Sequence, residues 1–355
     1  MKKKIIISIV ILPIVIFLIV ALCVALGHKH SYEITEILPS VEARGCTLYT
    51  CSCGHSYEEN IVPALTPAQG LQYELNNDGA SYSVIGIGTC EDVNINIPIE
   101  HEGKPVTQIL EHAFADCVFI ESITVSNKID YIGQGAFMNC ISLKEIRMGN
   151  SVSKIGSYAF SGCASLEKVT FNSSVSKIDS MAFEGCAKLE SITLPEKITI
   201  ISFGMFKDCS SLKCISLSKN IENIDLFAFE GCVSLEFIEV DDNNKFYQSI
   251  DGNVYSKDGK IFHIYAVGKN NEEFIVPNHV STVKAAAFED SKLKKIYVPS
   301  SVEIIENDAF KGCNLLEMIC CEAESKPDAF GEYWNIYAKL GQKTEIPVVW
   351  GYKEN

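Results

Sequence analysis

The stretch CISLKEIRMGNSVSKIGSYAF, from Cys140 to Phe160, contains the pattern that decides the fold. Its first half, Leu-x-x-Ile-x-Met, predicts a short strand with one buried face, and Gly149-Asn150 predicts the turn that follows it. Its second half, Val-x-x-Ile and then Ala-Phe, predicts a return segment that also carries apolar side chains. Because a unit this short cannot enclose a core by itself, it must stack on neighbours of the same kind.

Those neighbours are present, because the pattern recurs with a period of 23 residues. The phenylalanine column consists of Phe114, Phe137, Phe160, Phe183, Phe206 and Phe229, and it continues at Phe288 and Phe310. A cysteine follows three residues later at Cys117, Cys140, Cys163, Cys186, Cys209, Cys232 and Cys313. We therefore predict a β-rich solenoid, a right-handed superhelix of coils of about 23 residues whose strands form a parallel ladder.

The period is interrupted once, between Phe229 and Phe288. The extra length corresponds to one coil enlarged to 36 residues. Asp251-Gly252 and Asp258-Gly259 are hairpin signals, so a β-hairpin should project from this coil, in an insertion over about 241–273. In the following unit, which is one residue short, the cysteine is missing at Asp290.

Both ends of the repeat region, 106–325, depart from the pattern and are predicted to be caps. Residues 66–105 form the N-terminal cap, with strands expected at 73–75, 82–87 and 95–97. Residues 326–355 form the C-terminal cap, which carries the aromatic residues Trp334, Tyr337 and Trp350.

Residues 1–29 read as a targeting segment. Lys2, Lys3 and Lys4 precede an uncharged apolar run from Ile5 to Leu26, which is long enough to span a membrane. The lysines should stay inside, so the rest of the chain is expected to be exported. An uncleaved N-terminal anchor and a cleaved signal peptide both remain open, and they predict a membrane-anchored surface protein and a secreted protein respectively.

Residues 30–65 form a small cysteine-rich module. Cys46, Cys51 and Cys53, together with His30, are a candidate set of ligands for a structural zinc ion. The spacing lacks the paired Cys-x-x-Cys knuckles of the common zinc modules, and one disulfide with a free thiol is the alternative. No other cofactor is predicted.

The repeat pattern, C-x2-L-x2-I-x-L followed by V-x2-I-x4-A-F, resembles the BspA-like leucine-rich repeat family of exported bacterial and protozoan surface proteins. The resemblance extends over roughly residues 70–355 and includes SIDGNVYSKDGK (249–260) and the tail segments CEAESKPDAF (321–330) and PVVWGYK (347–353). It implies a leucine-rich repeat solenoid that acts in adhesion or interaction, and it implies no catalytic residues.

Composition and spacing agree with a function other than catalysis. The 45 acidic residues outnumber the 30 basic ones, and the formal charge of −15 disfavours nucleic acid as a partner. The cysteine column is expected to consist of buried free thiols, because strands about 4.8 Å apart hold the thiols too far apart for an undistorted disulfide. Motifs of hydrolases, zinc proteases and nucleotide-binding enzymes are absent from the sequence, so we predict that the chain is not an enzyme.

The predicted function is binding of an extracellular protein or glycan through the exposed face of the strand ladder. Side chains alternate along a strand, so two columns should point outward in every coil. The candidate ligand-binding residues in these columns are Phe237, Tyr297, Glu145, Arg147, Lys168, Glu239 and Lys295. Phe237 and Tyr297 flank the enlarged coil and would form one apolar patch with the hairpin, unless the hairpin covers them. A passive surface or stalk component is the alternative function.

Overall fold

The computed structural model describes residues 31–37, 39–41, 43–52, 54–339 and 342–353. The chain separates into two compact units, with the boundary between Leu65 and Thr66. Every regular element in the described ranges is a strand. Within those ranges no helix is long and apolar enough to cross a membrane, and the predicted targeting segment, 1–29, lies outside them.

The first unit contains one antiparallel sheet of three strands, in the order β1-β2-β3. They are β1 (Tyr32–Ile37), β2 (Gly45–Cys51) and β3 (Ser56–Val62). Tyr49 and Tyr57 are cross-strand partners whose rings stack with centroids 4.6 Å apart, and Tyr32 packs edge-on against Tyr57 at 5.2 Å. Such aromatic cross-strand pairs stabilise a small sheet that has few other apolar contacts.

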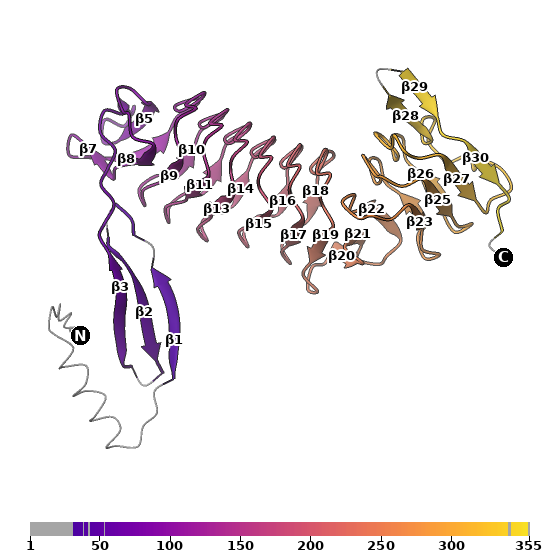
Figure 1. The fold of residues 1–355 in the computed structure, drawn as a ribbon, viewed down its shortest axis with the longest axis horizontal. Coiled ribbons are helices and arrows are strands. Elements are labelled where there is room, and N and C mark those ends of the chain that lie inside the picture. The colour runs from indigo at the N-terminus through magenta and orange to yellow at the C-terminus, as the bar shows by residue number, and fades with distance from the viewer. Residues whose placement is uncertain (1–30, 38, 42, 53, 340–341, 354–355) are drawn as a thin grey trace. The chain divides into compact units, whose positions relative to one another are not determined.

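The second unit is a β-solenoid of coils of about 23 residues, as predicted. Figure 1 shows successive coils side by side in chain order from β8 to β18. The first strand of each coil belongs to a set that we call the front ladder. Its members are β6 (Asn94–Asn96), β9 (Ser122–Thr124), β11 (Glu145–Arg147), β13 (Lys168–Thr170), β15 (Ser191–Thr193), β17 (Cys214–Leu217), β19 (Phe237–Val240), β23 (Glu273–Ile275), β25 (Lys295–Val298), β27 (Met318–Cys321) and β30 (Val348–Trp350).

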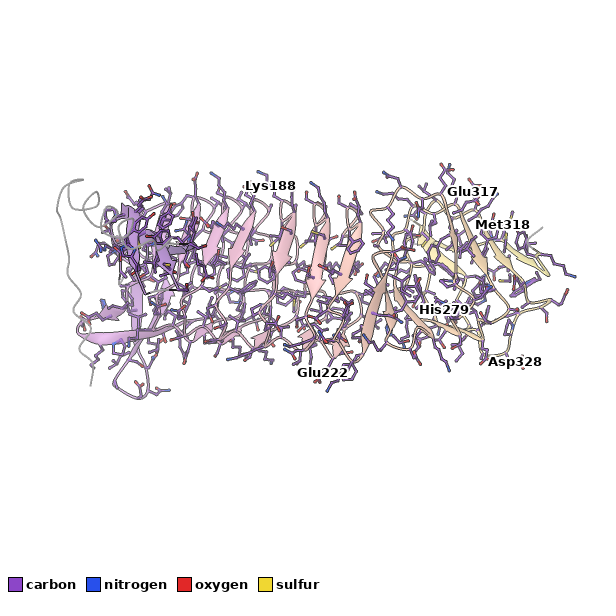
Figure 2. All side chains as sticks on the ribbon, turned by 90° about the horizontal axis from the view of Figure 1, so that it is seen from below. Lys188, Glu222, His279, Glu317, Met318 and Asp328 are labelled. Atoms are coloured by element: carbon purple, nitrogen blue, oxygen red, sulfur yellow. The ribbon has the colours of Figure 1, made fainter. Side chains whose placement is uncertain are left out.

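The return segments form a second set, the back ladder. Its members are β4 (Gln72–Leu75), β5 (Tyr82–Gly86), β8 (Lys104–Ile109), β10 (Tyr131–Ile132), β12 (Lys154–Ile155), β14 (Lys177–Ile178), β16 (Ile200–Ile201), β18 (Asn223–Ile224), β22 (Ile261–Ile264), β24 (Thr282–Val283) and β26 (Ile304–Ile305). The remaining strands of this unit are β7 (Glu100–His101), β20 (Tyr247–Ile250), β21 (Asn253–Ser256), β28 (Ile336–Lys339) and β29 (Gln342–Glu345). Figure 2 shows the coils from below, with Lys188 and Glu317 along one edge of the stack and Glu222 and Asp328 along the other.

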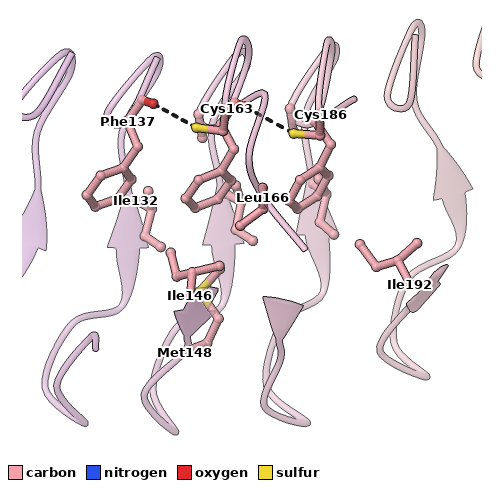
Figure 3. Packing of buried hydrophobic residues seen from close by; sticks show 14 of the residues in the cluster. Ile132, Phe137, Ile146, Met148, Cys163, Leu166, Cys186 and Ile192 are labelled. Atoms are coloured by element: carbon pink, nitrogen blue, oxygen red, sulfur yellow. Dashed lines mark hydrogen bonds between the residues drawn. The ribbon is translucent and has the colours of Figure 1, made fainter. Parts of the chain in front are cut away.

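Equivalent residues of neighbouring coils pair in register, so the apolar columns run through the core, which consists of one cluster up to Val254 and a second from Tyr255 onward. Ile146 of β11 pairs with Ile123 on one side and with Val169 on the other. The phenylalanine rings stack between the ladders, with centroids 5.1 to 5.9 Å apart from Phe114 to Phe229. Figure 3 shows Phe137, Ile132 and Ile146 of this core. Stacking of the coils therefore buries apolar side chains that no single coil could enclose.

The cysteine column is buried beside the phenylalanines, and its thiols donate hydrogen bonds between coils. Cys163 Sγ donates to the carbonyl oxygen of Phe137, one coil earlier, at 3.1 Å (Figure 3). Equivalent bonds join Cys140 to Phe114, Cys186 to Phe160, Cys209 to Phe183, Cys232 to Phe206 and Cys313 to Phe288. Burial raises the pKa of Cys163 to about 12, so its thiol remains protonated at neutral pH.

Each phenylalanine sits at the centre of a tight loop, which we call the Phe loop and define as the Phe with the two residues on either side. Both outer residues have a positive φ, for example 58° at Tyr158 and 73° at Gly162 around Phe160. A side chain in this left-handed region costs roughly 1–2 kcal/mol. Backbone bonds between successive loops offset that cost: Tyr158 N–H donates to Ser180 O and Gly162 N–H to Glu184 O.

Both ladders are interrupted between the coil of Phe171 and the next one. β13 does not pair with β15, and β14 does not pair with β16, whereas the Phe loops of the same two coils remain hydrogen-bonded. Phe171 occupies the column that Met148 and Leu194 occupy in the adjacent coils, and its ring packs edge-on against Phe183 at 6.1 Å. We attribute the opening to this larger side chain, because a close-packed core transmits extra volume to the backbone.

The enlarged coil contains the predicted turns, but its hairpin does not project. β20 and β21 form an antiparallel hairpin around Asp251-Gly252, and β21 pairs with β22 beyond Gly259. β22 then runs parallel to β24, so it serves as the return segment of this coil. Val254 and Tyr255 are buried, which shows that the hairpin packs into the solenoid instead of standing out from it.

The sequence pattern places the missing cysteine at Asp290, but the structure places it one residue later, at Ser291. Ser291 holds the place of the cysteine: its N–H donates to Phe288 O, and its hydroxyl lies 3.3 Å from the thiol of Cys313. Asp290 is instead the outer residue of the Phe loop, with a φ of 59°. The serine keeps a small polar side chain at the buried corner that cysteine occupies in the other coils.

The two ends of the solenoid are covered by their own strands. At the N-terminal end β4, β5 and β8 extend the back ladder, and β6 begins the front ladder. At the C-terminal end β30 pairs with β27, and Trp334 packs against Phe330 with centroids 4.9 Å apart. Both ends of the solenoid thus carry strands that continue its ladders, and the bounds of the two caps stay a prediction.

Candidate functional site

The predicted binding residues lie on the front ladder, and their side chains point away from the core. Residues of this face are neighbours across coils, as Glu145 is opposite both Ser122 and Lys168. Half-buried or exposed side chains alternate with buried ones along these strands, for example in β11 and in β17. The alternation that the sequence predicted for this face is present, whereas its role in binding stays a prediction.

Three of the charged candidates form one ion-pair group on this face. Arg147 binds Glu145 through two nitrogens, Nε at 3.2 Å and Nη2 at 2.9 Å, and Lys168 Nζ lies 3.2 Å from Glu145 Oε1. Burial alone would raise the pKa of Glu145, but the hydrogen bonds from Arg147 and Lys168 outweigh it and lower that pKa. The group is thus satisfied internally, and a ligand would have to compete with it for Arg147.

Phe237 is the most exposed aromatic candidate on the front ladder. Its side chain is 47% exposed, and its strand β19 pairs with β17, where Cys214 is its direct partner. On the other side of β19 the hairpin turn approaches, since Ile238 N–H donates to Gly252 O at 2.9 Å. A Cβ at Gly252 would lie 2.7 Å from the Phe237 ring, so only glycine lets the turn come this close. The hairpin therefore borders the ring without covering it.

Tyr297 has a different environment. Its hydroxyl donates to Glu273 Oε2 at 3.0 Å, and its ring lies 5.2 Å from that of Tyr352. The hydrogen bond to Glu273 raises the pKa of Tyr297 to about 12. The neighbouring Lys295 also pairs with Glu273, at 3.5 Å. Tyr297 is thus partly packed, in contrast to Phe237.

Phe237 and Tyr297 belong to different sheets. Phe237 lies in the sheet β15-β17-β19, and Tyr297 lies in the sheet β23-β25-β27-β30. The hairpin turn at Gly252 takes the position beside β19 where the next front strand would pair. Glu239, on the same strand as Phe237, accepts a hydrogen bond from Ser216 at 2.8 Å. A shared patch of both rings stays a prediction.

The predicted zinc ligands lie only in part within the described residues. Cys46 and Cys51 are both on β2, five residues apart, which corresponds to roughly 17 Å of extended strand. His30 and Cys53 fall outside the described ranges. The described part of the chain contains no group of three or more His, Cys, Asp or Glu placed to hold a metal ion. The strand does not by itself bring the two thiols together, and the zinc site stays a prediction.

Comparison with known families decides the classification. The family described as "BspA type Leucine rich repeat region" matches residues 132–261 and 262–333, in six copies. The matched segments cover more than half of the chain. The chain belongs to the BspA-type leucine-rich repeat family. Its fold and family are of kinds that are not enzymatic.

Solved structures of bacterial leucine-rich repeat proteins share the fold. A leucine-rich cell surface protein from Faecalibacterium prausnitzii is 26% identical with a TM-score of 0.56, over 76% of this chain and 78% of that one. A protein from Bacteroides ovatus is also 26% identical with a TM-score of 0.56, over 75% of this chain and 66% of its own. A protein from Eubacterium ventriosum, at 20% identity and a TM-score of 0.53 over 72% and 70%, shows the fold alone. Comparison with curated proteins gives no significant match.

Sequence reasoning missed Tyr265, which takes the place of the phenylalanine in the enlarged coil. Tyr265 N–H donates to Ala287 O, just as Phe206 N–H donates to Ala228 O in a regular coil. The ring of Tyr265 lies 5.7 Å from that of Phe288. The available signal was the spacing, because Tyr265 precedes Phe288 by one 23-residue period.

Proposed function

We propose that this BspA-type protein is exported and binds a protein or glycan partner at the cell surface through the exposed face of its front ladder. The observation that carries the proposal is the 47% exposure of Phe237 on β19, the strand of the sheet β15-β17-β19 that the hairpin turn borders. Interfaces concentrate binding energy in such aromatic residues. The cell-surface description of the Faecalibacterium relative supports an extracellular location, as does the apolar segment after Lys4.

The surrounding chemistry favours a polar rim around that ring. Ser216 and Glu239 are hydrogen-bonded neighbours on adjacent strands, and the Glu145 ion-pair group lies further along the same face. A polar rim around an apolar, often aromatic, centre is typical of protein interfaces. A passive surface or stalk component is the alternative function, and it would need no binding residue at Phe237.

Binding of the purified exported chain to panels of extracellular matrix proteins and to glycan arrays tests the proposal. We expect at least one ligand whose binding is lost in Phe237→Ser. Phe119→Ser is the matched control, because Phe119 is similarly exposed, at 40%, but lies outside the strands. A ligand lost equally in both variants, or no ligand at all, would favour the passive component.

A further inference from the structure

A cleft of about 90 Å³ opens at the enlarged coil. One wall is the segment 224–230, the other is formed by residues 284–286 and Glu289, and His263, Ile264 and Tyr265 lie between them. A buried water occupies roughly 10–15 Å³ on this scale, so the cleft has room for about six to nine waters or a short piece of polypeptide.

A shortened loop creates the cleft. Phe262 pairs with Val283 in the back ladder, and Tyr265 takes the phenylalanine position that Phe288 takes in the next coil. Four residues separate Val283 from Phe288, but only two separate Phe262 from Tyr265. The Phe loop of the enlarged coil is therefore two residues short, and it does not reach outward between its neighbours.

The shortening leaves backbone groups of both walls without the partners that regular coils supply. In a regular coil Met181 N–H donates to Phe203 O and Phe183 N–H donates to Met205 O, both at 3.0 Å. At the cleft, the N–H groups of Phe227 and Phe229 have no protein partner in the described part of the chain. The same holds for the carbonyls of Ala285 and Glu289 on the opposite wall. One wall thus presents donors and the other presents acceptors.

Contacts that bypass the shortened coil join the two walls directly. Gly231 N–H donates to Asp290 Oδ2 at 3.2 Å, although 59 residues separate the two. Lys311 Nζ bridges Glu230 at 3.1 Å and Glu289 at 2.7 Å. Because one coil lies between the walls, they are about two strand spacings apart, roughly 10 Å. That is the width that one extended chain fills when it bonds to both sides.

The lining favours a positively charged segment with small side chains. Leu226 and Ala286 are among the apolar lining residues, and Asp225 is an acidic lining residue outside the Lys311 bridge, which pairs Glu230 and Glu289. The amine of Lys284 is already paired with Glu306 at 2.5 Å. Burial lowers the pKa of His263 to about 4, so the imidazole between the walls adds no positive charge at neutral pH.

We propose that the cleft binds a short extended segment of a partner protein, with small residues at its centre and a Lys or Arg beside them. The segment replaces the missing part of the Phe loop: its carbonyls accept from the N–H groups of Phe227 and Phe229, and its own N–H donates to Ala285 O, beside the bond that Tyr265 already makes to Ala287 O. This is main-chain recognition of the kind by which sheet edges bind peptides, with side-chain selectivity added by the lining. The site is separate from the front-ladder face and does not depend on the function proposed for that face.

The test is selection of a random heptapeptide library displayed on phage against the exported protein. Insertion of Ser-Gly between His263 and Ile264 restores the regular loop length and should close the cleft. We expect peptides with Gly or Ala next to Lys or Arg to be enriched, and their synthetic forms to bind at least tenfold more weakly to the insertion variant. N-methylation of their central amides should weaken binding comparably.

A substitution and its control guard against misfolding of the insertion variant. Ala285→Phe narrows the cleft at a loop position where Phe203 stands in another coil, and Ser180→Phe makes the same change in a coil without a cleft. Binding should fall at least tenfold in Ala285→Phe and stay unchanged in Ser180→Phe. No enrichment, or equal binding by all variants, would overturn the proposal. Self-association lost only in Ala285→Phe would also overturn it, by assigning the cleft to a second copy of the chain.

Amide hydrogen exchange tests directly whether the N–H groups of Phe227 and Phe229 lack a hydrogen-bond partner in the free protein. In the free protein the amides of Phe227 and Phe229 should exchange far faster than those of Phe183 and Phe206, which are hydrogen-bonded to the next coil. A bound peptide should protect Phe227 and Phe229 while leaving Phe183 unchanged. Equally slow exchange of all four amides in the free protein would show that the N–H groups of Phe227 and Phe229 are already hydrogen-bonded, and would refute the proposal.

Discussion

Cys163 donates its thiol proton to the carbonyl of Phe137, a residue 26 positions earlier and one coil away. That carbonyl also accepts the N–H of Cys140 in its own coil, so one oxygen joins two coils. A valine would fill the same space but leave the second lone pair of this buried oxygen unused. The cysteine column therefore strengthens the stacking of coils, which explains its recurrence without any redox role.

Native thiols of this column should resist modification. We expect an alkylating reagent or Ellman's reagent to react quickly with Cys214, the exposed cysteine of the front ladder, and to leave Cys140, Cys163 and Cys186 unmodified until the protein is denatured. Mass mapping of the labelled peptides gives the comparison. Disulfides between consecutive column positions would contradict this arrangement.

Stability should fall at alkaline pH. Burial raises the pKa of Cys163 from 9.0 to about 12, so the folded state holds the proton more tightly than the unfolded state does. The stabilisation is complete below about pH 9 and is lost as the pH rises towards 12, by at most about 1.4 kcal/mol per pH unit for each such thiol.

Denaturant midpoints at pH 8, 9.5 and 10.5 measure this decline. Cys163→Ala removes one ionisable thiol, so its stability should be lower at pH 8 but decline less steeply above pH 9. A midpoint that stays constant from pH 8 to 10.5 in the parent protein would show that the thiols are not buried.

Truncation of a central ring should damage the solenoid locally. Phe183 is fully buried and stacks between Phe160 at 5.4 Å and Phe206 at 5.9 Å, so Phe183→Ala should lower the free energy of unfolding by about 3–5 kcal/mol. Phe203→Ala is the control, since Phe203 is 38% exposed and should cost far less. Thermal unfolding and hydrogen exchange report the loss and its spread to adjacent coils. An unchanged melting temperature in Phe183→Ala would refute the core assignment.

The contact between Gly231 and Asp290 should hold the walls of the cleft together. Asp290→Ala leaves the Gly231 N–H without its acceptor and places a non-polar residue at a positive φ, so we expect a loss of about 1–3 kcal/mol. Asp290→Asn retains an acceptor and tolerates the left-handed conformation, so it should lose much less. Denaturant unfolding distinguishes the two variants, and equal losses would show that the contact contributes little.

The repeat could be predicted in detail because its signal is redundant. Phe183, for example, has seven equivalents, five of them at 23-residue steps, and each apolar column fixes the register independently. The Asp251-Gly252 and Asp258-Gly259 turns were also predictable, since a type-specific turn is encoded locally. Packing of the hairpin into the solenoid was not, because burial of Val254 and Tyr255 depends on neighbours far along the chain.

The cleft could not be predicted from the sequence either, because it also depends on contacts between distant parts of the chain. The two-residue deficit before Tyr265 is visible only after Tyr265 is recognised as the residue that replaces phenylalanine, and the sequence around it offers no Ala-Phe pair. Asp290 reaches Gly231 across an intervening coil, a relationship without a sequence period. Tyr297 likewise looked as free as Phe237, because its packing against Tyr352 involves the C-terminal cap.

That difference between the two rings shapes the last prediction, which concerns partner binding. Phe237 is exposed and is not part of the buried core. Phe237→Ser should therefore weaken the binding of a front-ladder ligand by roughly 2 kcal/mol, about thirtyfold in Kd, with little change in the stability of the fold. Tyr297→Ser removes the hydroxyl that binds Glu273 and the ring beside Tyr352, so it should also lower stability. Tyr297→Phe keeps the ring and separates the two effects.

The affinity of each variant for the ligand, measured together with its thermal unfolding, tests this prediction. If Phe237 is the anchor, its variant loses binding at an unchanged melting temperature, and Tyr297→Phe binds normally because the ring at 297 is retained. A Phe237→Ser protein that unfolds would place the ring beneath the hairpin turn at Gly252, contrary to its exposure. A stable Phe237→Ser protein that binds with full affinity would move the site away from this strand, and the Glu145 ion-pair group, which has the only arginine on the outward face of the described front ladder, would be the next surface to test.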